Sequence, residues 1–218
     1  MPAGKRPAEI SNNLGAWYAK RGSTRCAIAA FESALRDDPK FLDARYNLGL
    51  ALIQDGQARR AAGELETLVQ QAPELARAHL ALGIAWKESG NLTDAESQFR
   101  NTLKLEPKST AALRHLGDVL AAQKRYTAAI TYLRQAVDLE PSDVDSRVAL
   151  AQAMYENGQA DAAIDFLAKM VAAHPRVAFA ESNLGTLYAR QKRFEEAAEH
   201  FRKAIALDPS NDVVRLSL

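Results

Sequence analysis

Apolar side chains recur along this chain at helical spacing, and the pattern is clearest in residues 178–211. There Leu184, Gly185 and Tyr188 fall on one stripe at about 100° per residue, which predicts a helix over 178–191. A second stripe, formed by Phe201 with alanines on either side, predicts another helix over 195–208. Two amphipathic helices joined by a short turn form a helical hairpin, which we expect as the basic unit of the fold.

The same pattern occurs six times with a period of 34 residues and without insertion or deletion. Position 7 is always leucine, from Leu14 to Leu184, and belongs to the stripe that we expect to be buried. Position 20 is always alanine, position 32 is always proline, and position 8 is glycine except for Ala151. A fixed period of this length indicates stacked helical units that contact only their neighbours. The six repeats are residues 8–41, 42–75, 76–109, 110–143, 144–177 and 178–211.

The small and rigid residues have separate roles in each repeat. Glycine at position 8 and alanine at position 20 allow the two helices to approach closely, while bulky residues at positions 11 and 24 fill the space beside them. Proline at position 32 ends the second helix. The turn at position 15 favours glycine because its backbone is left-handed, and the two repeats with Lys124 and Lys192 there are expected to close differently.

Composition narrows the range of partners and compartments. The 218-residue chain has a formal net charge of +1, with charges of both signs in every repeat, which disfavours binding to nucleic acid or to a membrane surface. A single Cys26 excludes an internal disulfide framework. Because no apolar run has the length of a signal peptide core or a membrane span, we expect a cytoplasmic protein without membrane insertion. Residues 1–7 are expected to form a disordered tail.

The motif L-G-x-x-[YLWM], followed by alanine at position 20, an aromatic residue or leucine at 24 and proline at 32, resembles the tetratricopeptide repeat. The stretch NLGTLYARQKRFEEAAEHFRKAIALDP is similar to the consensus of that family, and the resemblance covers residues 8–211. It implies an all-α fold, a right-handed α-solenoid of six helix-turn-helix repeats whose concave groove is lined by the first helices. It also implies a protein–protein interaction scaffold that holds a protein or peptide partner in this groove.

Groove residues are expected on the face of each first helix opposite its buried stripe, at positions 2, 5, 6, 9, 12 and 13. This face is apolar in the second and third repeats and charged in the fourth. The candidate partner-binding residues are Asn13, Tyr46, Asn47, Leu50, Arg77, Leu80, Ile84, Lys87, Arg114, His115, Asp118 and Asn183.

Two interpretations of these candidates stay open at this point. The apolar members either form a binding patch beside Arg77 and Lys87, for a ligand with an apolar segment and a carboxylate, or pack between neighbouring helices. Asn13, Asn47 and Asn183 share position 6, where arrays similar to that of O-linked N-acetylglucosamine transferase carry an asparagine ladder that grips a peptide backbone. The alternative is that these amides are solvated or cap helices. The carboxylate clamp of chaperone-binding members matches at only two of its five positions.

Catalytic and cofactor sites find no support in the sequence. The four histidines lie at four different repeat positions, so no pair has the spacing of metal ligands. His79 is expected in the core, and His174 and His200 on the surface. His115 and Asp118 are three residues apart on the groove face, but no nucleophile accompanies them. We therefore expect no enzyme activity, no metal and no cofactor.

The C-terminal residues 212–218 match the first seven positions of another repeat and predict the start of a seventh first helix, or a truncated capping helix. Terminal repeats normally carry a polar cap. Two hypotheses follow: the chain is the substrate-recruiting arm of a larger enzyme or of an assembly or secretion machine, or its last repeat self-associates with a second copy.

Overall fold

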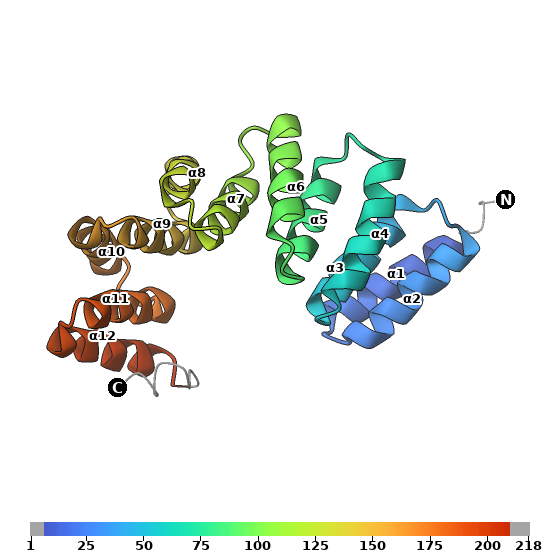
Figure 1. Cartoon of the computed structure of the whole chain (residues 1–218). Coiled ribbons are helices and arrows are strands. Elements are labelled where there is room, and N and C mark those ends of the chain that lie inside the picture. The colour runs from blue at the N-terminus through green and yellow to red at the C-terminus, as the bar shows by residue number, and fades with distance from the viewer. Residues whose placement is uncertain (1–6, 210–218) are drawn as a thin grey trace. The chain divides into compact units, whose positions relative to one another are not determined.

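The computed structural model describes residues 7–209, and these residues form twelve helices and no strand (Figure 1). The helices pair into six hairpins, each made of a first helix A and a second helix B. The A helices are α1 (Pro7–Lys20), α3 (Leu42–Gln54), α5 (Ala76–Glu88), α7 (Thr110–Ala122), α9 (Val144–Glu156) and α11 (Ala178–Arg190). The B helices are α2 (Thr24–Asp37), α4 (Ala58–Gln71), α6 (Leu92–Leu105), α8 (Tyr126–Leu139), α10 (Ala160–Ala173) and α12 (Phe194–Leu207). The two helices predicted in the sixth repeat are confirmed to within one residue at each end.

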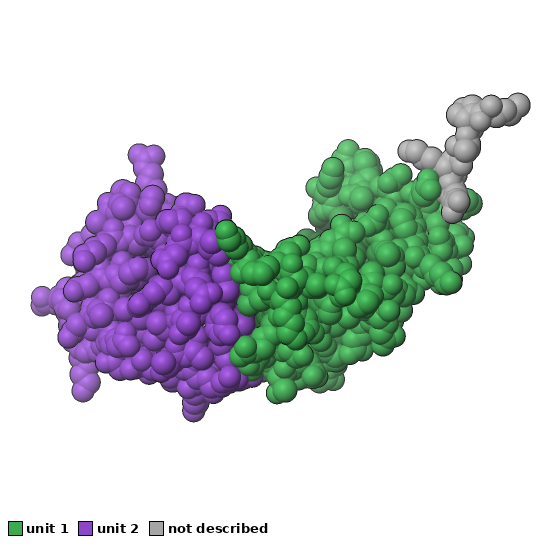
Figure 2. Space-filling view, turned by 90° about the horizontal axis from the view of Figure 1, so that it is seen from above, with its two compact units in different colours: residues 1–112 green, residues 113–218 purple. Residues whose placement is uncertain are grey.

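The chain divides into two compact units, residues 1–112 and residues 113–218, which are coloured green and purple in Figure 2. Unit 1 contains α1 to α6, and unit 2 contains most of α7 and all of α8 to α12. In unit 1, α2 packs against α3 and α4 packs against α5, so that one apolar cluster runs through successive hairpins from Phe31 through Leu48 and Leu65 to Leu82. This stacking of hairpins is the all-α solenoid expected from the repeat.

Close contact between the two helices of a hairpin depends on glycine at position 8. A methyl group placed on Gly83 would lie 2.6 Å from Cε1 of Phe99, and one placed on Gly117 would lie 2.4 Å from Cγ of Leu133. The large residue at position 24 therefore occupies the space where a side chain at position 8 would be. Alanine at position 20 is buried in all six hairpins, which keeps the two helix axes close.

The turns between A and B helices correct one prediction. Gly22, Gly56 and Gly90 have left-handed backbones, with φ between 73° and 85°, as expected. Lys124 and Lys192 adopt the same conformation, both with φ of 61°, although they carry side chains. In both kinds of turn, the backbone N–H of the residue after the left-handed one donates to the carbonyl oxygen five residues earlier. Gln57 donates in this way to Leu52 and Arg125 to Leu120, each over 2.8 Å. The lysine turns thus close as the glycine turns do, at a cost of about 1–2 kcal/mol for a left-handed residue with a Cβ.

The N-terminal hairpin differs from the sequence prediction in two places. Pro7, which we assigned to the tail, is the first residue of α1, a position that suits proline because its missing N–H would lack a helical partner anyway. Leu14 is 46% exposed, whereas the position-7 leucines Leu48 and Leu184 are at most 2% exposed. Those leucines are covered by the preceding B helix, α2 or α10, and α1 has no such neighbour among the described residues.

Two further predictions fall outside the residues described. The rest of the expected tail, residues 1–6, is one of them, and the start of a seventh helix at 212–218 is the other. The repeat boundaries themselves stay a prediction from the sequence period.

Candidate functional site

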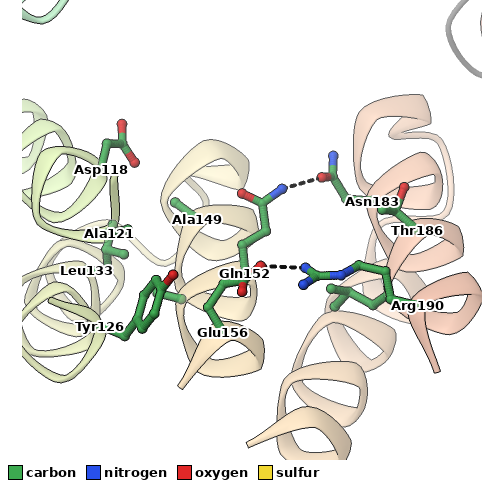
Figure 3. Close-up of a pocket in the computed structure, with 12 residues that line it drawn as sticks. Asp118, Ala121, Tyr126, Leu133, Ala149, Gln152, Glu156, Asn183, Thr186 and Arg190 are labelled. Carbon is green, nitrogen blue, oxygen red and sulfur yellow. Dashed lines mark hydrogen bonds and ion pairs between the residues drawn. The ribbon is translucent and has the colours of Figure 1, made fainter. Parts of the chain in front are cut away.

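A hollow of about 530 Å³ opens on the A-helix side of unit 2 (Figure 3). Its walls come from α7, α9 and α11, with Tyr126 and Leu133 added from α8. The A-helix residues lie mainly at repeat positions 6, 9, 12 and 13, which share the face opposite the buried stripe. The lining residues are Asp118, Ala121, Tyr126, Leu133, Ala149, Gln152, Ala153, Glu156, Asn183, Thr186, Leu187 and Arg190.

Two side-chain amides meet across this hollow. Gln152 Nε2 on α9 donates to Asn183 Oδ1 on α11 over 2.6 Å (Figure 3). Asn183 Nδ2 donates to the Phe179 carbonyl oxygen over 2.7 Å. The second of these bonds fixes the orientation of the Asn183 amide within its own helix. Gln152 is exposed, so its carbonyl oxygen and second N–H face the hollow and the solvent. The pair therefore presents both acceptor and donor groups at one place.

An ion pair lies beside the amides. Arg190 Nη1 donates to Glu156 Oε1 over 2.6 Å, and the guanidinium carbon lies 4.3 Å from the centre of the Tyr155 ring. The hydrogen bond that Arg190 donates to Glu156 raises the pKa of Arg190 above its ordinary value. Because both partners are more than one-third exposed, solvent screens this pair and its contribution to stability is small. Its main effect is to hold two opposite charges at the wall of the hollow.

The charged residues predicted on α7 lie together, but in a loose arrangement. Asp118 lines the hollow, with its Oδ2 atom 3.8 Å from Arg114 Nη1 and 3.7 Å from His115 Nδ1. Both distances exceed those of a hydrogen bond. Arg114 Nε also lies 4.0 Å from Asp143 Oδ2, so its charge is shared between two carboxylates. Asp118 and Asn183 are thus the predicted residues that line the hollow, whereas Arg114 and His115 are not among its lining residues.

Tyr126 and Glu156 belong to the site, but we did not include them among the candidates. Tyr126 is the first residue of α8, at repeat position 17, and the groove pattern considered only A helices. It reaches the hollow because the short A–B turn brings the first turn of a B helix next to the end of the A helix (Figure 3). Glu156 lies at position 13, which is one of the groove positions. An acidic residue at a groove position could have identified it from the sequence.

Unit 1 has a smaller hollow, of about 270 Å³, between α1 and α3. Of the predicted residues, Asn47 and Leu50 line it. Asn47 Nδ2 donates to Asn12 Oδ1 over 3.0 Å, so this amide joins two A helices. Asn13, the first member of the predicted ladder, is exposed on α1. Position-6 asparagines are therefore engaged by neighbouring side chains in both units.

The apolar patch predicted in unit 1 is smaller than expected. Leu50 is 39% exposed, but Tyr46, Leu80 and Ile84 are each half-buried. Tyr46 packs against the hydrophobic core of the unit, as does Ile53 on the same helix. Packing between A helices, the second of our two interpretations, thus describes Tyr46 better than a free binding patch does.

The cations predicted to hold a carboxylate already have partners. Arg77 Nη2 donates to Asp43 Oδ1 over 2.7 Å, and its guanidinium lies 4.9 Å from the centre of the Tyr46 ring. Lys87 Nζ lies 3.5 Å from Glu88 Oε1. Arg77 thus already bonds to a carboxylate within the chain, and the carboxylate site beside Arg77 and Lys87 stays a prediction.

The histidines correct a further prediction. His200 is half-buried rather than superficial, and its Nδ1 lies 2.6 Å from Oε2 of the buried Glu181. His79 is buried as predicted and bonds to Gln98 and to the Pro73 carbonyl oxygen. His174 is exposed, as expected. Residues 7–209 contain no group of three or more metal-ligating side chains close enough to share an ion. None of the described helices has both the length and the apolar character needed to cross a bilayer.

Solved structures with the same fold are available for comparison, whereas no curated protein sequence matches significantly. A tetratricopeptide repeat protein from Parabacteroides merdae is 21% identical, with a TM-score of 0.80, over 99% of this chain and 84% of that one. The hetero-tetramer Cut9–Hcn1 of the APC/C is 20% identical, with a TM-score of 0.78, over 98% of this chain and 43% of that one. YrrB, described as a TPR protein with an unusual peptide-binding site, is 23% identical, with a TM-score of 0.62, over 86% of this chain and 97% of that one. At these identities the likeness concerns the fold.

Family models give the assignment directly. Models of the tetratricopeptide repeat match residues 18–84 and 120–181, residues 80–144, and residues 178–211. The first of these alone accounts for more than half of the chain. The protein belongs to the tetratricopeptide repeat family.

Proposed function

We propose that this protein is an interaction scaffold and that the hollow of unit 2 binds an extended segment of its partner. The observation that carries the proposal is the amide pair Gln152–Asn183 at the wall of a 530 Å³ hollow on the A-helix side. A volume of this size lies within the range of about 300–1,000 Å³ that is typical of ligand sites. The likeness to YrrB, whose peptide-binding site is part of its description, supports a peptide-like ligand.

An extended backbone is the chemistry that the amide pair fits. A peptide in this conformation offers an N–H and a C=O at every residue, and a side-chain amide offers both an acceptor and a donor in return. Gln152 and Asn183 come from neighbouring A helices, α9 and α11, so a segment lying across both helices meets them in succession. Asn183 is held by its bond to the Phe179 carbonyl oxygen, which lowers the entropic cost of fixing it on binding.

Charged walls restrict the side chains that the segment carries. Asp118 and the Glu156–Arg190 pair line the same hollow as the amides (Figure 3). A long apolar side chain placed there would desolvate these charges without pairing them, which is unfavourable. The segment is therefore polar where it faces α7 and α9.

The test uses a peptide display library selected on the 218-residue chain, followed by fluorescence anisotropy of the recovered peptides. Replacing Gln152 or Asn183 by alanine is expected to weaken binding by about 3–10-fold for each side chain, because each loses about one net hydrogen bond. Gln135→Ala is the matched control, since Gln135 is an exposed glutamine on α8 that does not line the hollow. Peptides that bind the wild type and the Gln152→Ala, Asn183→Ala double variant equally well would show that the hollow is not the binding site.

Other features predicted from the sequence complete the proposal. The scaffold acts without catalysis and without nucleic acid, and it works in the cytoplasm. It also self-associates through its C-terminal hairpin. In α12, Phe194 is 67% exposed and Leu207 is 39% exposed, while Ile205 lies on the same side of the helix as Phe194 and is half-buried.

If the chain self-associates, its molar mass in solution should rise with protein concentration. Ile205→Glu should reduce the wild-type oligomer to a monomer, because it places a charge in the apolar contact. Size-exclusion chromatography with light scattering measures this, and Lys203→Glu, on the opposite side of α12, is the control. A wild-type chain that stays monomeric at high concentration would rule out this contact and leave the groove proposal intact.

A further inference from the structure

Unit 2 has a second pocket, which is formed by α10, α11 and α12 and has a volume of about 490 Å³. Most of its lining residues are apolar, among them Val171 on α10, Leu184 on α11 and Leu207 on α12. We call it the α10–α12 pocket. It shares no lining residue with the hollow on the A-helix side, so it is a separate place on the same unit.

The sequence of α10 explains why there is space for this pocket. In the four preceding B helices, repeat positions 25 and 29 carry charged or amide side chains, such as Arg100 and Lys104 on α6. In α10 both positions are alanine, Ala168 and Ala172, and both residues line the pocket. The apolar wall is therefore a property of this hairpin and not of the repeat in general.

Two residues with hydrogen-bond acceptors line the pocket as well. Glu181, at position 4 of α11, is only 3% exposed, and its Oε2 atom lies 2.6 Å from His200 Nδ1. Among residues 7–209, no group donates a hydrogen bond to the other carboxylate oxygen, Oε1. The second residue is Pro175, whose carbonyl oxygen likewise accepts no hydrogen bond from the described part of the chain.

The second and third hairpins show what a complete contact looks like at this place. Arg45, at position 4 of α3, donates to the Glu64 carboxylate and, over 2.8 Å, to the Pro39 carbonyl oxygen. His79, at position 4 of α5, has its Nε2 atom 2.9 Å from the Pro73 carbonyl oxygen. In both hairpins, the side chain at position 4 thus supplies a donor to the carbonyl group of the proline six residues before it.

Glu181 reverses this chemistry. Pro175 also lies six residues before it, but a carboxylate only accepts hydrogen bonds and cannot bond to a carbonyl oxygen. The sixth hairpin therefore has two acceptors where the second and third have an acceptor and a donor. Leaving a buried carboxylate oxygen without a hydrogen bond is unfavourable. A group with several N–H donors and a positive charge is what this place lacks.

The lysine of the pocket wall is already engaged. Lys203 lines the pocket, but its ammonium group bonds to Glu199 on the same helix over 2.6 Å. No ion pair forms between Lys203 and Glu181 among the residues that the structure describes. The charges of Lys203 and Glu199 compensate each other, and the donor for Glu181 has to come from a ligand.

We propose that the α10–α12 pocket binds a lysine side chain of a protein partner. The ammonium group bonds to Glu181 Oε1 and to the Pro175 carbonyl oxygen, and the four-carbon stem lies along the apolar wall of α10. Lysine fits better than arginine because His200 already bonds to Oε2, so that a guanidinium cannot pair with both oxygens of the carboxylate. The inference does not depend on the function proposed for the hollow, because the two places share no residue.

The test follows the Cε1–H signals of the histidines in the 218-residue chain by ¹H–¹³C NMR at constant pH. The probe is acetyl-Gly-Lys-Gly amide, with sodium chloride at matched ionic strength as the reference. The His200 signal, identified by its loss in His200→Gln, should shift in a saturable way because His200 shares a hydrogen bond with Glu181. His79, whose contact in unit 1 is complete, should not respond. An unresponsive His200, or an equal response of both histidines, would overturn the proposal.

Analogues of the peptide identify the chemistry and the source of the ligand. Peptides with norleucine or arginine in place of lysine should bind at least about 10-fold more weakly, because the first lacks the charged donor and the second cannot use both carboxylate oxygens. An arginine peptide that binds as tightly as the lysine peptide would overturn the choice of lysine. Binding of n-butylammonium without binding of the lysine peptide would mean that the pocket takes free amines, which would overturn the assignment to a protein partner.

Two substitutions locate the binding site on the chain. Glu181→Gln keeps an acceptor for His200 but removes the charge, and it should weaken binding of the lysine peptide by about 10-fold or more. Ala172→Phe fills the pocket from an exposed position and should abolish binding. The matched control is Ala173→Phe, since Ala173 is exposed on the same helix but does not line the pocket, and it should bind as the wild type does. If Glu181→Gln does not fold, the two alanine positions still decide: equal binding by both phenylalanine variants would show that the lysine binds elsewhere.

Discussion

Replacing Phe99 by alanine is expected to destabilise unit 1 by about 3–5 kcal/mol, the usual cost of removing a buried aromatic side chain. Phe99 is fully buried on α6, and its ring fills the space beside Gly83 on α5. A glycine on the opposing helix has no side chain that could move into the cavity. The loss is large compared with the roughly 5–15 kcal/mol that stabilise a typical domain. Chemical denaturation followed by the fluorescence of Trp86, which packs against the core of unit 1, measures it.

Ile10→Ala is the control for this experiment. Ile10 is also a large apolar residue of unit 1, but it is 55% exposed. Its removal should change the free energy of unfolding by no more than about 0.5 kcal/mol, as for other surface positions. Equal losses in the two variants would contradict the assignment of position 24 as the main packing residue of each hairpin.

Two glycines of the second hairpin should respond to alanine in opposite directions. At Gly49 a methyl group would lie 2.6 Å from Cγ and from Cδ2 of the buried Leu65, so that Leu65 or a helix must move. Overpacking of this kind costs about 1–3 kcal/mol. We expect a net loss of about 1–2 kcal/mol, because alanine also favours the helix by about 1 kcal/mol.

Gly63→Ala provides the control in the same hairpin. Gly63 is exposed in the interior of α4, and an added methyl group would meet no atom within 4 Å. This variant should gain about 0.5–1 kcal/mol from the reduced backbone entropy of the unfolded chain. Urea denaturation of both variants measures the difference. Stabilisation by both substitutions would mean that the hairpin does not require the close approach seen at position 8.

Ala151 indicates how large the loss of stability in Gly49→Ala can be. It holds position 8 in the fifth hairpin and is fully buried there. The repeat can therefore accommodate one methyl group at this place when the opposing residue is positioned for it. For this reason we expect the cost of Gly49→Ala to remain below the upper end of the overpacking range.

Helix positions could be predicted from the sequence because they depend on local chemistry. The 34-residue period, the apolar stripes and the proline at position 32 act within a few residues of one another, and the predicted ends in the sixth repeat differ from the observed ends by one residue. The lysine turns were predicted incorrectly although they are local. A residue with a Cβ is expected to avoid a left-handed backbone, but Lys124 and Lys192 both adopt it. Each joins two helices that approach closely, at Gly117 and Leu133 and at Gly185 and Phe201.

The candidate site was predicted less completely. A helical wheel identified the face that lines the hollow, and so it found Asp118 and Asn183. It could not distinguish a free arginine from one already paired, as Arg77 is with Asp43 of the preceding repeat. It also missed Tyr126, which reaches the hollow from a B helix. The asparagine ladder stays a prediction, and two of its members, Asn47 and Asn183, bond to neighbouring residues within the chain.

Sequence alone determined that this protein is an array of tetratricopeptide hairpins, because period, small residues and helix ends are all encoded within one repeat. Tertiary structure decided which polar groups are satisfied, because their partners lie 19 or about 34 residues away on another helix. Arg45 pairs with Glu64, Glu181 with His200, and Arg190 with Glu156. The residues that remain available to a partner are those for which the folded chain supplies no counterpart.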